Sequence, residues 1–256
     1  MKRTTIILLV TLFMINTSLI AQGIENRENS SQLSKSEQEF VSKLKTFSKE
    51  HVSKFKLLKI RTQDGEVVTV ESFSDEIFKK VLQTKIAKEL DTSSLLLGMI
   101  IKPKYYQSLP LIYVDNPNIN RKLLTDKKKK YFSFNDFFNQ NREYILADDL
   151  TNAIKTTPSK RTAYDKELIL VDDTIALNFS IYDGSLLKIF PNPIDSKKWE
   201  SPQVAIESFP KNVSEMVRML MIRLFQGASD IESGKSAQKF NEAVELIGLY
   251  QTKYTK

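Results

Sequence analysis

The sequence predicts a mostly helical α+β protein, in which a small N-terminal β-hairpin over residues 56–71 packs with about seven helices. Two observations predict this class. Apolar residues recur three and four positions apart through much of the chain, which is the spacing of one helix face. Two short β-prone runs also flank an Asp-Gly pair, which is a strong signal for a tight hairpin turn.

Residues 1–21 have the layout of a secretory signal peptide, with cleavage expected between Ala21 and Gln22. A basic start, MKR, precedes an apolar stretch over residues 6–15 that only Thr11 interrupts. This stretch is shorter than the roughly 18–20 residues that cross a bilayer, so an uncleaved anchor is the lesser alternative. We therefore expect a periplasmic protein that is exported by this signal and associates with the outer face of the inner membrane.

Residues 22–34 are polar and aperiodic, which predicts a flexible linker, and residues 35–256 are expected to form a single extracytoplasmic helical domain. The first helix begins near Ser36, and its apolar face comprises Phe40, Leu44 and Phe47. The hairpin follows, with the Asp-Gly pair at its turn. A helix then begins at residues 72–76, and its apolar side comprises Ile77, Val81 and Ile86.

Asp91 is expected to cap the next helix, which carries the run LLLGMII and ends before Pro103. Residues 110–114, PLIYV, predict a buried extended segment, and the aromatic-rich residues 132–138 predict a short helix. Another helix is expected over residues 144–154. The clearest helical stripe follows, and it comprises Leu168, Val171, Ile175 and Phe179.

A proline-rich segment over residues 187–210 contains Trp199, the only tryptophan of the chain. Its prolines fix the backbone φ angle and exclude a helix, so we expect an extended chain without regular pairing. The C-terminal residues 212–254 are expected to form a helix pair. We predict that Trp199 is buried and pins this pair to the helix over residues 164–182. An exposed Trp199 that anchors a partner is the alternative.

The composition removes most catalytic chemistries. Cysteine is absent, which excludes disulfides, thiol nucleophiles and cysteine-ligated zinc, and His51 is the single histidine. No glycine-rich phosphate-binding motif occurs. The acidic pairs at 148–149 and 172–173 have side chains roughly 100° apart on a helix, so we interpret them as surface charges. The sequence therefore predicts no catalytic residue, no cofactor and no metal site. We expect His51 to stabilise a helix C-terminus rather than to ligate haem.

The net charge is +7, and removal of Lys2 and Arg3 with the signal would leave +5. Much of this excess lies in the lysine run at residues 127–130. Such clusters can neutralise nucleic-acid phosphates, but export of the protein argues against that partner. We therefore interpret the run as a solvated loop and expect no nucleic-acid partner.

Five blocks of sequence carry a resemblance to a known family. They are KEHVSKFKLLKIRTQDGEVVTVESFSDEI (49–77), LLLGMIIKPKYYQSLPLIYV (95–114), YFSFNDFF (131–138), YDKELILVDDTIALNF (164–179) and LKIFPNPIDSKKWESP (187–202). In this order they resemble the extracytoplasmic domain of the fused system II cytochrome c synthetases, which are ResB–CcsA type cytochrome c biogenesis proteins. The helix pair at the C-terminus resembles the paired helices that follow in that domain. The chain looks like that domain detached from its membrane helices.

The chain also departs from the family pattern. Gly65-Glu66-Val67 stands where the family has a glycine-rich run, and Tyr105 or Tyr106 stands where an aromatic residue, often Trp, precedes the PLIYV block. The family's tryptophan-rich haem-handling segment and membrane histidines have no counterpart in this sequence. The resemblance therefore implies a place in cytochrome c maturation, and it implies neither catalysis nor haem ligation by a residue of this chain.

We expect a non-catalytic accessory or scaffold domain, which holds apocytochrome c or a membrane-embedded cytochrome c synthetase subunit. A cell-envelope binding protein that keeps the fold but not the pathway is the alternative, and an enzyme with an unrecognised site is a third reading. Unfolded polypeptide binds at strand edges or apolar grooves. The hairpin is expected to offer free edges, and the predicted partner-binding residues are Tyr105, Tyr106 and Tyr113. Alternatively, these tyrosines line the boundary of the core.

Overall fold

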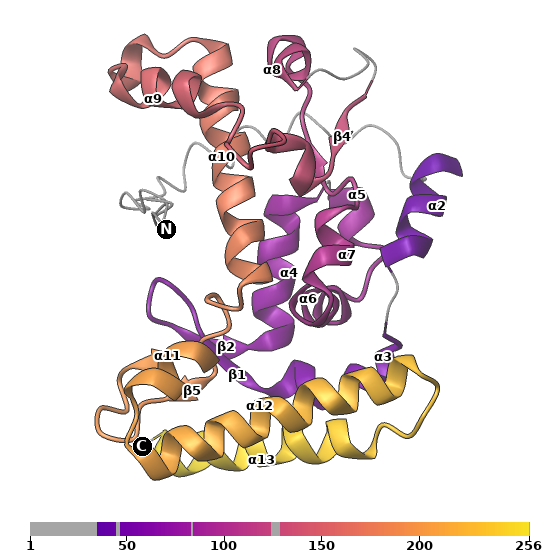
Figure 1. The fold of residues 1–256 in the computed structure, drawn as a ribbon, viewed down its shortest axis with the longest axis vertical. Coiled ribbons are helices and arrows are strands. Elements are labelled where there is room, and N and C mark those ends of the chain that lie inside the picture. Colours follow the sequence, from indigo (N-terminus) through magenta and orange to yellow (C-terminus); the bar gives the residue numbers. More distant parts are fainter. Residues whose placement is uncertain (1–34, 45–46, 83, 124–128, 256) are drawn as a thin grey trace.

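The computed structural model describes residues 35–44, 47–82, 84–123 and 129–255. The predicted signal peptide and linker lie outside the described residues. The described chain is mostly helical and contains small two-stranded antiparallel sheets, which confirms the predicted fold class. In Figure 1 the long helix α10 (Ala163–Tyr182) runs beside α4 (Val70–Val81), while α12 (Lys211–Glu232) and α13 (Gln238–Tyr254) cross below them.

The hairpin forms where the sequence predicts it. Strand β1 (Lys59–Arg61) pairs antiparallel with β2 (Val67–Thr69) across the Asp-Gly turn. Helix α4 begins directly after β2, earlier than the predicted start at Ser72. The reason is a cap: the Thr69 side-chain oxygen accepts a hydrogen bond from the Ser72 backbone N–H at 3.1 Å.

Helix α4 ends sooner than the pattern indicates. The backbone becomes extended at Leu82, with φ −103° and ψ 159°, so the helix cannot continue to Ile86. Ile86 instead lies on the separate short helix α5 (Thr84–Ala87). Its side chain is fully buried, so the expected apolar contact is kept by a second helix.

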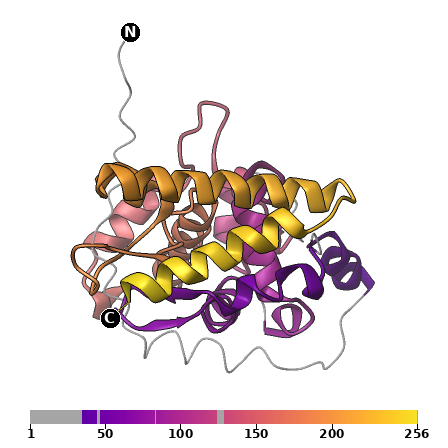
Figure 2. The same cartoon turned by 90° about the horizontal axis from the view of Figure 1, so that it is seen from below.

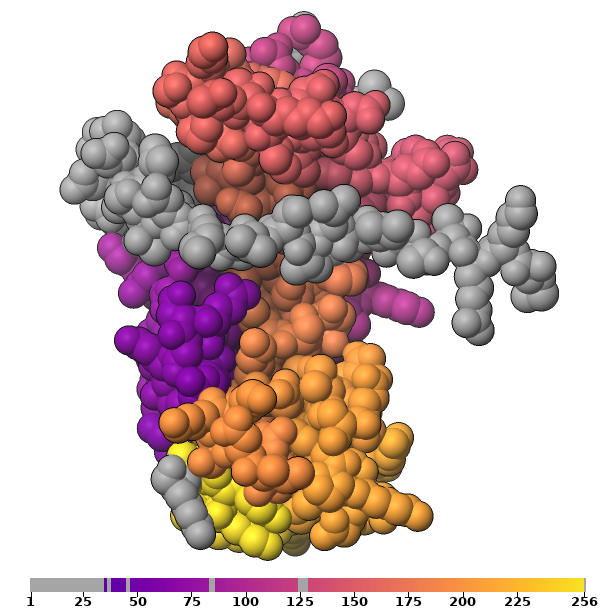
Figure 3. Space-filling model, turned by 90° about the vertical axis from the view of Figure 1, so that its left-hand side faces the viewer, coloured from indigo at the N-terminus to yellow at the C-terminus, as the bar shows by residue number. Residues whose placement is uncertain are grey.

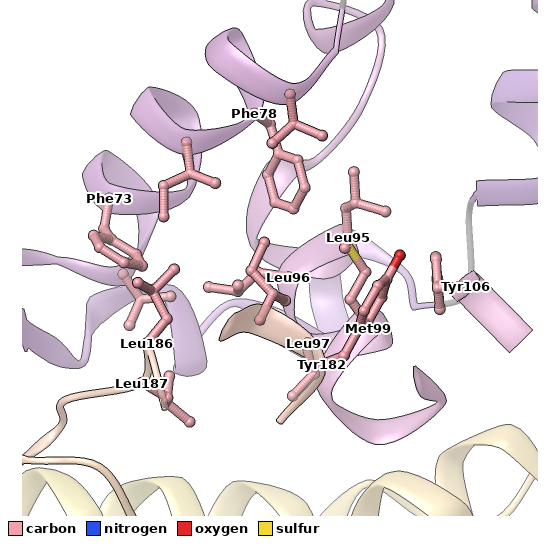
Figure 4. Close-up of a cluster of buried hydrophobic side chains, with 14 of the residues drawn as sticks. Phe73, Phe78, Leu95, Leu96, Leu97, Met99, Tyr106, Tyr182, Leu186 and Leu187 are labelled. Carbon is pink, nitrogen blue, oxygen red and sulfur yellow. The ribbon is translucent and has the colours of Figure 1, made fainter. Parts of the chain in front are cut away.

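Helix α6 (Thr92–Ile101) lies at the centre of the core. Asp91 caps it as predicted, because its side chain accepts a hydrogen bond from the Ser94 backbone N–H at 3.0 Å. Residues 95–99 are all buried. A helix that is apolar on all sides is surrounded by protein, and Figure 4 shows the α6 side chains enclosed by those of α4 and of the chain around the end of α10.

A close contact fixes the next helix, α7 (Pro103–Gln107), on α6. A Cβ atom at Gly98 would lie 2.3 Å from the Tyr106 Oη atom, so only glycine admits the tyrosine at this point. The Tyr106 ring packs directly on the α6 backbone and is fully buried. Figure 4 shows Tyr106 on the side of α6 opposite to Phe73 of α4.

The remaining N-terminal and central elements are short. The predicted extended segment at 110–114 contains β3 (Ile112–Tyr113), which pairs with β4 (Tyr131–Phe132). The aromatic run after it forms a 3₁₀ helix instead of an α-helix. The short helices are α2 (Lys35–Leu44), α3 (Lys49–Val52), η2 (Phe55–Leu57), α8 (Pro117–Lys122), η3 (Phe134–Phe137), α9 (Ala147–Lys155) and η4 (Pro158–Lys160).

Helix α10 confirms most of its predicted stripe. Leu168, Val171 and Ile175 are buried. Phe179 is exposed, which corrects its assignment to the core. Its ring stacks on that of Phe134 from η3, with centroids 6.5 Å apart, so it covers the edge of the core from outside.

The proline-rich segment is not extended throughout, because residues 202–208 form helix α11 (Pro202–Ser208), where Pro202 stands in the first turn and is tolerated. Trp199 is only 4% exposed, which confirms its predicted burial. The expected lack of regular pairing is wrong, because β5 (Phe190–Pro191) pairs antiparallel with β6 (Trp199–Glu200). Proline is tolerated here because the backbone hydrogen bond falls on the next residue, where the Asn192 N–H donates to Lys198 O at 2.8 Å. The predicted role of Trp199 in packing the C-terminal helix pair against α10 stays a prediction.

Helix α13 holds this segment against the hairpin. The Tyr250 hydroxyl donates to Pro191 O at 2.9 Å. The Gln251 side chain donates to Ile189 O at 2.9 Å and to Lys59 O at 2.7 Å, and it accepts from the Lys59 N–H at 2.9 Å. One buried amide therefore joins the C-terminal helix, the proline-rich segment and β1.

The predicted C-terminal helix pair is present, and Figure 2 shows α12 and α13 side by side across the lower face of the molecule. The two helices approach closely at Gly227, where a Cβ atom would lie 2.3 Å from the Phe240 backbone nitrogen. Among the described residues, no helix combines the length and the apolar character that crossing a membrane requires.

Candidate functional site

A groove of about 510 Å³ lies where the end of α10 meets α11 (Pro202–Ser208) and α12. Its floor is apolar, since Tyr182, Leu187 and Met221 are buried there. In Figure 4, Tyr182 and Leu187 lie on the side of α6 that faces the C-terminal helices. In the space-filling view of Figure 3, the orange residues of the proline-rich segment and α12 form the lower part of the molecule, below α9 and α10.

The walls and the rim of the groove differ in chemistry. Ile206 of α11 and Phe225 of α12, which is 38% exposed, present apolar surface at its mouth. Gln203 and Glu207 of α11 and Arg218 of α12 stand at the rim and are exposed. An apolar cleft with a few polar groups around it is the usual form of a protein binding site. Both charge signs occur at this rim, which suits the mixed donors and acceptors of a peptide backbone.

The buried phenol in the floor stays neutral. Burial, and after it the neighbouring Tyr106, raises the pKa of Tyr182 above its ordinary value. A neutral phenol adds no charge to the apolar floor of the cleft. The groove therefore supplies apolar contact area from its floor and hydrogen-bonding groups from its rim.

The structure places the three predicted tyrosines differently. Tyr105 is 44% exposed, and its hydroxyl donates to Lys43 O at 3.1 Å. Tyr106 is fully buried, and its hydroxyl donates to Leu44 O at 3.2 Å. Tyr113 is half-buried. Tyr106 can meet no partner without opening the core, so its assignment to a binding surface is corrected to a packing role.

Helix α2 contacts both parts of the predicted tyrosine surface. Tyr105 and Tyr106 lie edge to face at 5.3 Å, and both donate to carbonyl groups of α2. Tyr113 lies edge to face with Tyr131 at 5.3 Å, and Tyr131 lies 6.1 Å from Phe40 of α2. The chain thus uses much of this aromatic surface to hold its own helix, and the binding roles of Tyr105 and Tyr113 stay predictions.

The outer edge of β1 is not free, which corrects a second expectation. The Arg61 N–H donates to Lys188 O at 3.0 Å. Both backbone groups of Lys59 are bonded by the Gln251 side chain. An edge whose polar groups are already paired cannot add a further strand.

The lysine run ends in ion pairs where the structure describes it. Lys129 contacts the Asp136 carboxylate at 2.8 Å, and Lys130 contacts that of Asp115 at 2.7 Å. Burial alone would raise the pKa of Asp136, but hydrogen bonds from Lys129 and Ser133 outweigh it and lower that pKa. The described end of the run lies outside the helices and strands, Lys130 is exposed, and both lysines form ion pairs at the surface, which agrees with the interpretation as a solvated loop.

The two acidic pairs have different environments. Burial opposes ionisation of Asp149, but hydrogen bonds from Lys122 and Tyr164 hold its pKa below the ordinary value. In the second pair, burial and then the charge of Asp172 raise the pKa of Asp173 to about 6. Asp172 and Asp173 are therefore half-buried groups, which corrects their interpretation as simple surface charges.

The polar residues of the described ranges do not assemble into a metal site. No group of three or more His, Asp or Glu side chains stands close enough to hold a metal ion in that part of the chain. His51 lies in the last turn of α3, where its backbone N–H bonds the capping side chain of Ser48. Its position fits the predicted role at a helix C-terminus.

Sequence reasoning missed the groove, although one signal was present. Phe225 lies one position after Leu224 on α12 and falls outside the buried stripe of that helix. A large aromatic side chain off the stripe has to be covered by another element or stay exposed. Only the fold shows that α11 stands beside it.

Comparison with known proteins gives one informative match. No family model matches the chain. The chain is 25% identical over 195 residues to Protein NrfI of Wolinella succinogenes. The matched region covers 76% of this chain and 21% of NrfI, so the chain spans about a fifth of the length of this relative.

Proposed function

We propose that the chain is a non-catalytic domain of the cytochrome c maturation machinery, which holds an extended segment of apocytochrome c in the groove between α10, α11 and α12. A membrane-embedded synthetase subunit is its second expected partner. The domain works at the outer face of the inner membrane, after export.

Two similarities support the coarser part of this proposal, a role in cytochrome c maturation. The five sequence blocks resemble the extracytoplasmic domain of system II synthetases, and the similarity to Protein NrfI agrees with that pathway. Because the match spans 21% of NrfI, the activity of the whole relative does not follow for this chain.

The groove supports the finer part of the proposal, which is that the chain holds an extended segment of apocytochrome c. Its buried apolar floor can take one large side chain, and Phe225 and Ile206 extend the apolar surface to the mouth. Arg218 at the rim can donate to the C=O groups of an extended backbone, and Gln203 and Glu207 can bond it by exchanging the hydrogen bond that Gln203 Nε2 donates to Glu207 Oε1 at 3.0 Å. Such a site recognises an unfolded chain by one anchor and its backbone, and it demands no fixed sequence.

Photocrosslinking in living cells tests this proposal. The reactive amino acid p-benzoylphenylalanine replaces Phe225 in the groove, and Phe179 serves as the matched control because its exposure is similar and it is not one of the residues that line the groove. A third position, Tyr105, tests the predicted tyrosine surface.

We expect capture of apocytochrome c from position 225 and not from position 179. Capture from position 105 alone would move the holding site to the tyrosine surface. Equal capture from all three positions would mean non-specific contact and would defeat the proposal. Capture of unrelated envelope proteins from position 225 would favour the alternative, a cell-envelope binding protein that keeps the fold but not the pathway.

A further inference from the structure

The outer face of the α12–α13 pair carries an apolar strip. Its members are Met219, Ile222, Leu246 and Leu249, which are between 43% and 66% exposed. Figure 2 shows that both helices face the viewer when the molecule is seen from below. Scattered apolar residues are ordinary on a surface, whereas a contiguous strip marks an interaction site.

Contacts between the two helices show that the strip is contiguous. The helices are antiparallel, with Gly227 against Phe240, and Arg223 forms an ion pair with Glu242 one turn further along. One more turn brings Met219 of α12 level with Leu246 of α13. Ile222 and Leu249 flank this pair on the outward sides of their helices.

The two borders of the strip carry opposite charges. Arg218 lies on the border of α12 that faces the groove, and Glu245 lies on the border of α13 that faces Lys54, with which it pairs. Glu242 and Glu245 are paired with Arg223 and Lys54, so these four residues add no net charge that would attract a surface of anionic lipid. A protein surface with the reverse order of charges suits this strip better.

We propose that this strip binds a second copy of the chain and forms a symmetric four-helix bundle. The twofold axis runs parallel to the helices, above the strip and midway between α12 and α13. It places α12 of one copy over α13 of the other. The four apolar residues of each copy then meet at the centre. Arg218 of each copy comes to the border where Glu245 of the other copy lies, and Glu245, which pairs with Lys54 of its own copy, receives Arg218 as a second cation.

The available area is sufficient for a modest dimer. Helix α13 has 17 residues, which gives a length of about 25 Å, and two helices of about 10 Å width present about 500 Å² on each copy. The total of about 1,000 Å² is at the lower limit for a specific interface. We therefore expect a dimer that dissociates in the micromolar range. This inference stands apart from the proposed function, because none of the four apolar residues of the strip lines the groove, while Arg218 borders both surfaces.

Sedimentation equilibrium of the full chain over a range of concentrations tests the inference. We expect twice the protomer mass at high concentration and a dissociation constant at least tenfold weaker for Leu249→Glu. Ile194→Glu is the matched control, because Ile194 is 83% exposed and lies in the turn between β5 and β6. Circular dichroism of each variant checks that the fold is kept.

A charge exchange tests the geometry of the dimer. Arg218→Glu alone is expected to weaken it, and the double variant Arg218→Glu, Glu245→Arg is expected to restore it. A monomer at all concentrations would overturn the inference. A dimer that Leu249→Glu leaves unchanged, or a charge exchange without recovery, would also overturn it. Capture of a different protein on this strip in cells, in place of a second copy of the chain, would overturn it as well.

Discussion

Gln251 is the residue whose removal should disturb the most distant parts of the fold. Its amide bonds the N–H and C=O of Lys59 and the C=O of Ile189, at 2.7–2.9 Å. Gln251→Leu keeps the size of the side chain and removes all three bonds. Ile189 is fully buried, so its carbonyl loses its partner away from water, whereas the groups of the exposed Lys59 can be hydrated in part.

The magnitude follows from this difference. A buried backbone group without a partner costs about 1–3 kcal/mol, and each of the two partly exposed groups costs about 1 kcal/mol. We therefore expect Gln251→Leu to lower the free energy of unfolding by about 3–5 kcal/mol in urea titrations. The control is Thr252→Val, which changes the next residue on the exposed side and should cost at most about 0.5 kcal/mol. A Gln251→Leu protein within about 1 kcal/mol of the wild type would refute the reasoning.

Three further predictions concern the core, the acidic pair and haem. Trp199→Ala should cost about 3–5 kcal/mol and lower the melting temperature, because a buried aromatic side chain is removed; an unchanged temperature would contradict this. Asp173 has a pKa raised from 3.8 to about 6, so the folded state binds a proton more tightly than the unfolded chain and loses stability as the pH rises from about 4 to 6. At pH 8 the free energy of unfolding of Asp173→Asn should therefore exceed that of the wild type by at most about 3 kcal/mol, and by about half of that after solvent screening. The difference should vanish near pH 3 when unfolding is measured as a function of pH. The isolated protein should hold no stoichiometric haem; a Soret band that survives gel filtration and disappears in His51→Ala would contradict this.

Local signals in the sequence predicted much of the fold. The Asp-Gly turn, the cap at Asp91 and the helix pair at the C-terminus depend on neighbouring residues, and the structure contains all three. The burial of Trp199 also follows from its size and from the prolines around it. Such features need no knowledge of distant segments.

The misses depend on contacts between distant residues. Tyr106 is buried because Gly98 leaves room for its ring and α2 supplies a carbonyl to its hydroxyl, and neither neighbour can be identified from the tyrosine itself. The edge of β1 is occupied by Gln251, which is 192 residues away from Lys59. The groove likewise forms only where α10, α11 and α12 converge.

The central claim, that this chain holds apocytochrome c in its groove, is tested most directly by the amount of holocytochrome c in cells. Haem-stained gels compare cells that lack the chain with cells that carry the wild type or Phe225→Glu, which places a charge at the apolar mouth of the groove. Phe179→Glu, a change of equal chemistry outside the groove, is the control. The account predicts loss of holocytochrome c without the chain, recovery with the wild type and the control, and at most a small recovery with Phe225→Glu. Unchanged holocytochrome c in cells without the chain, or full recovery with Phe225→Glu, would contradict it.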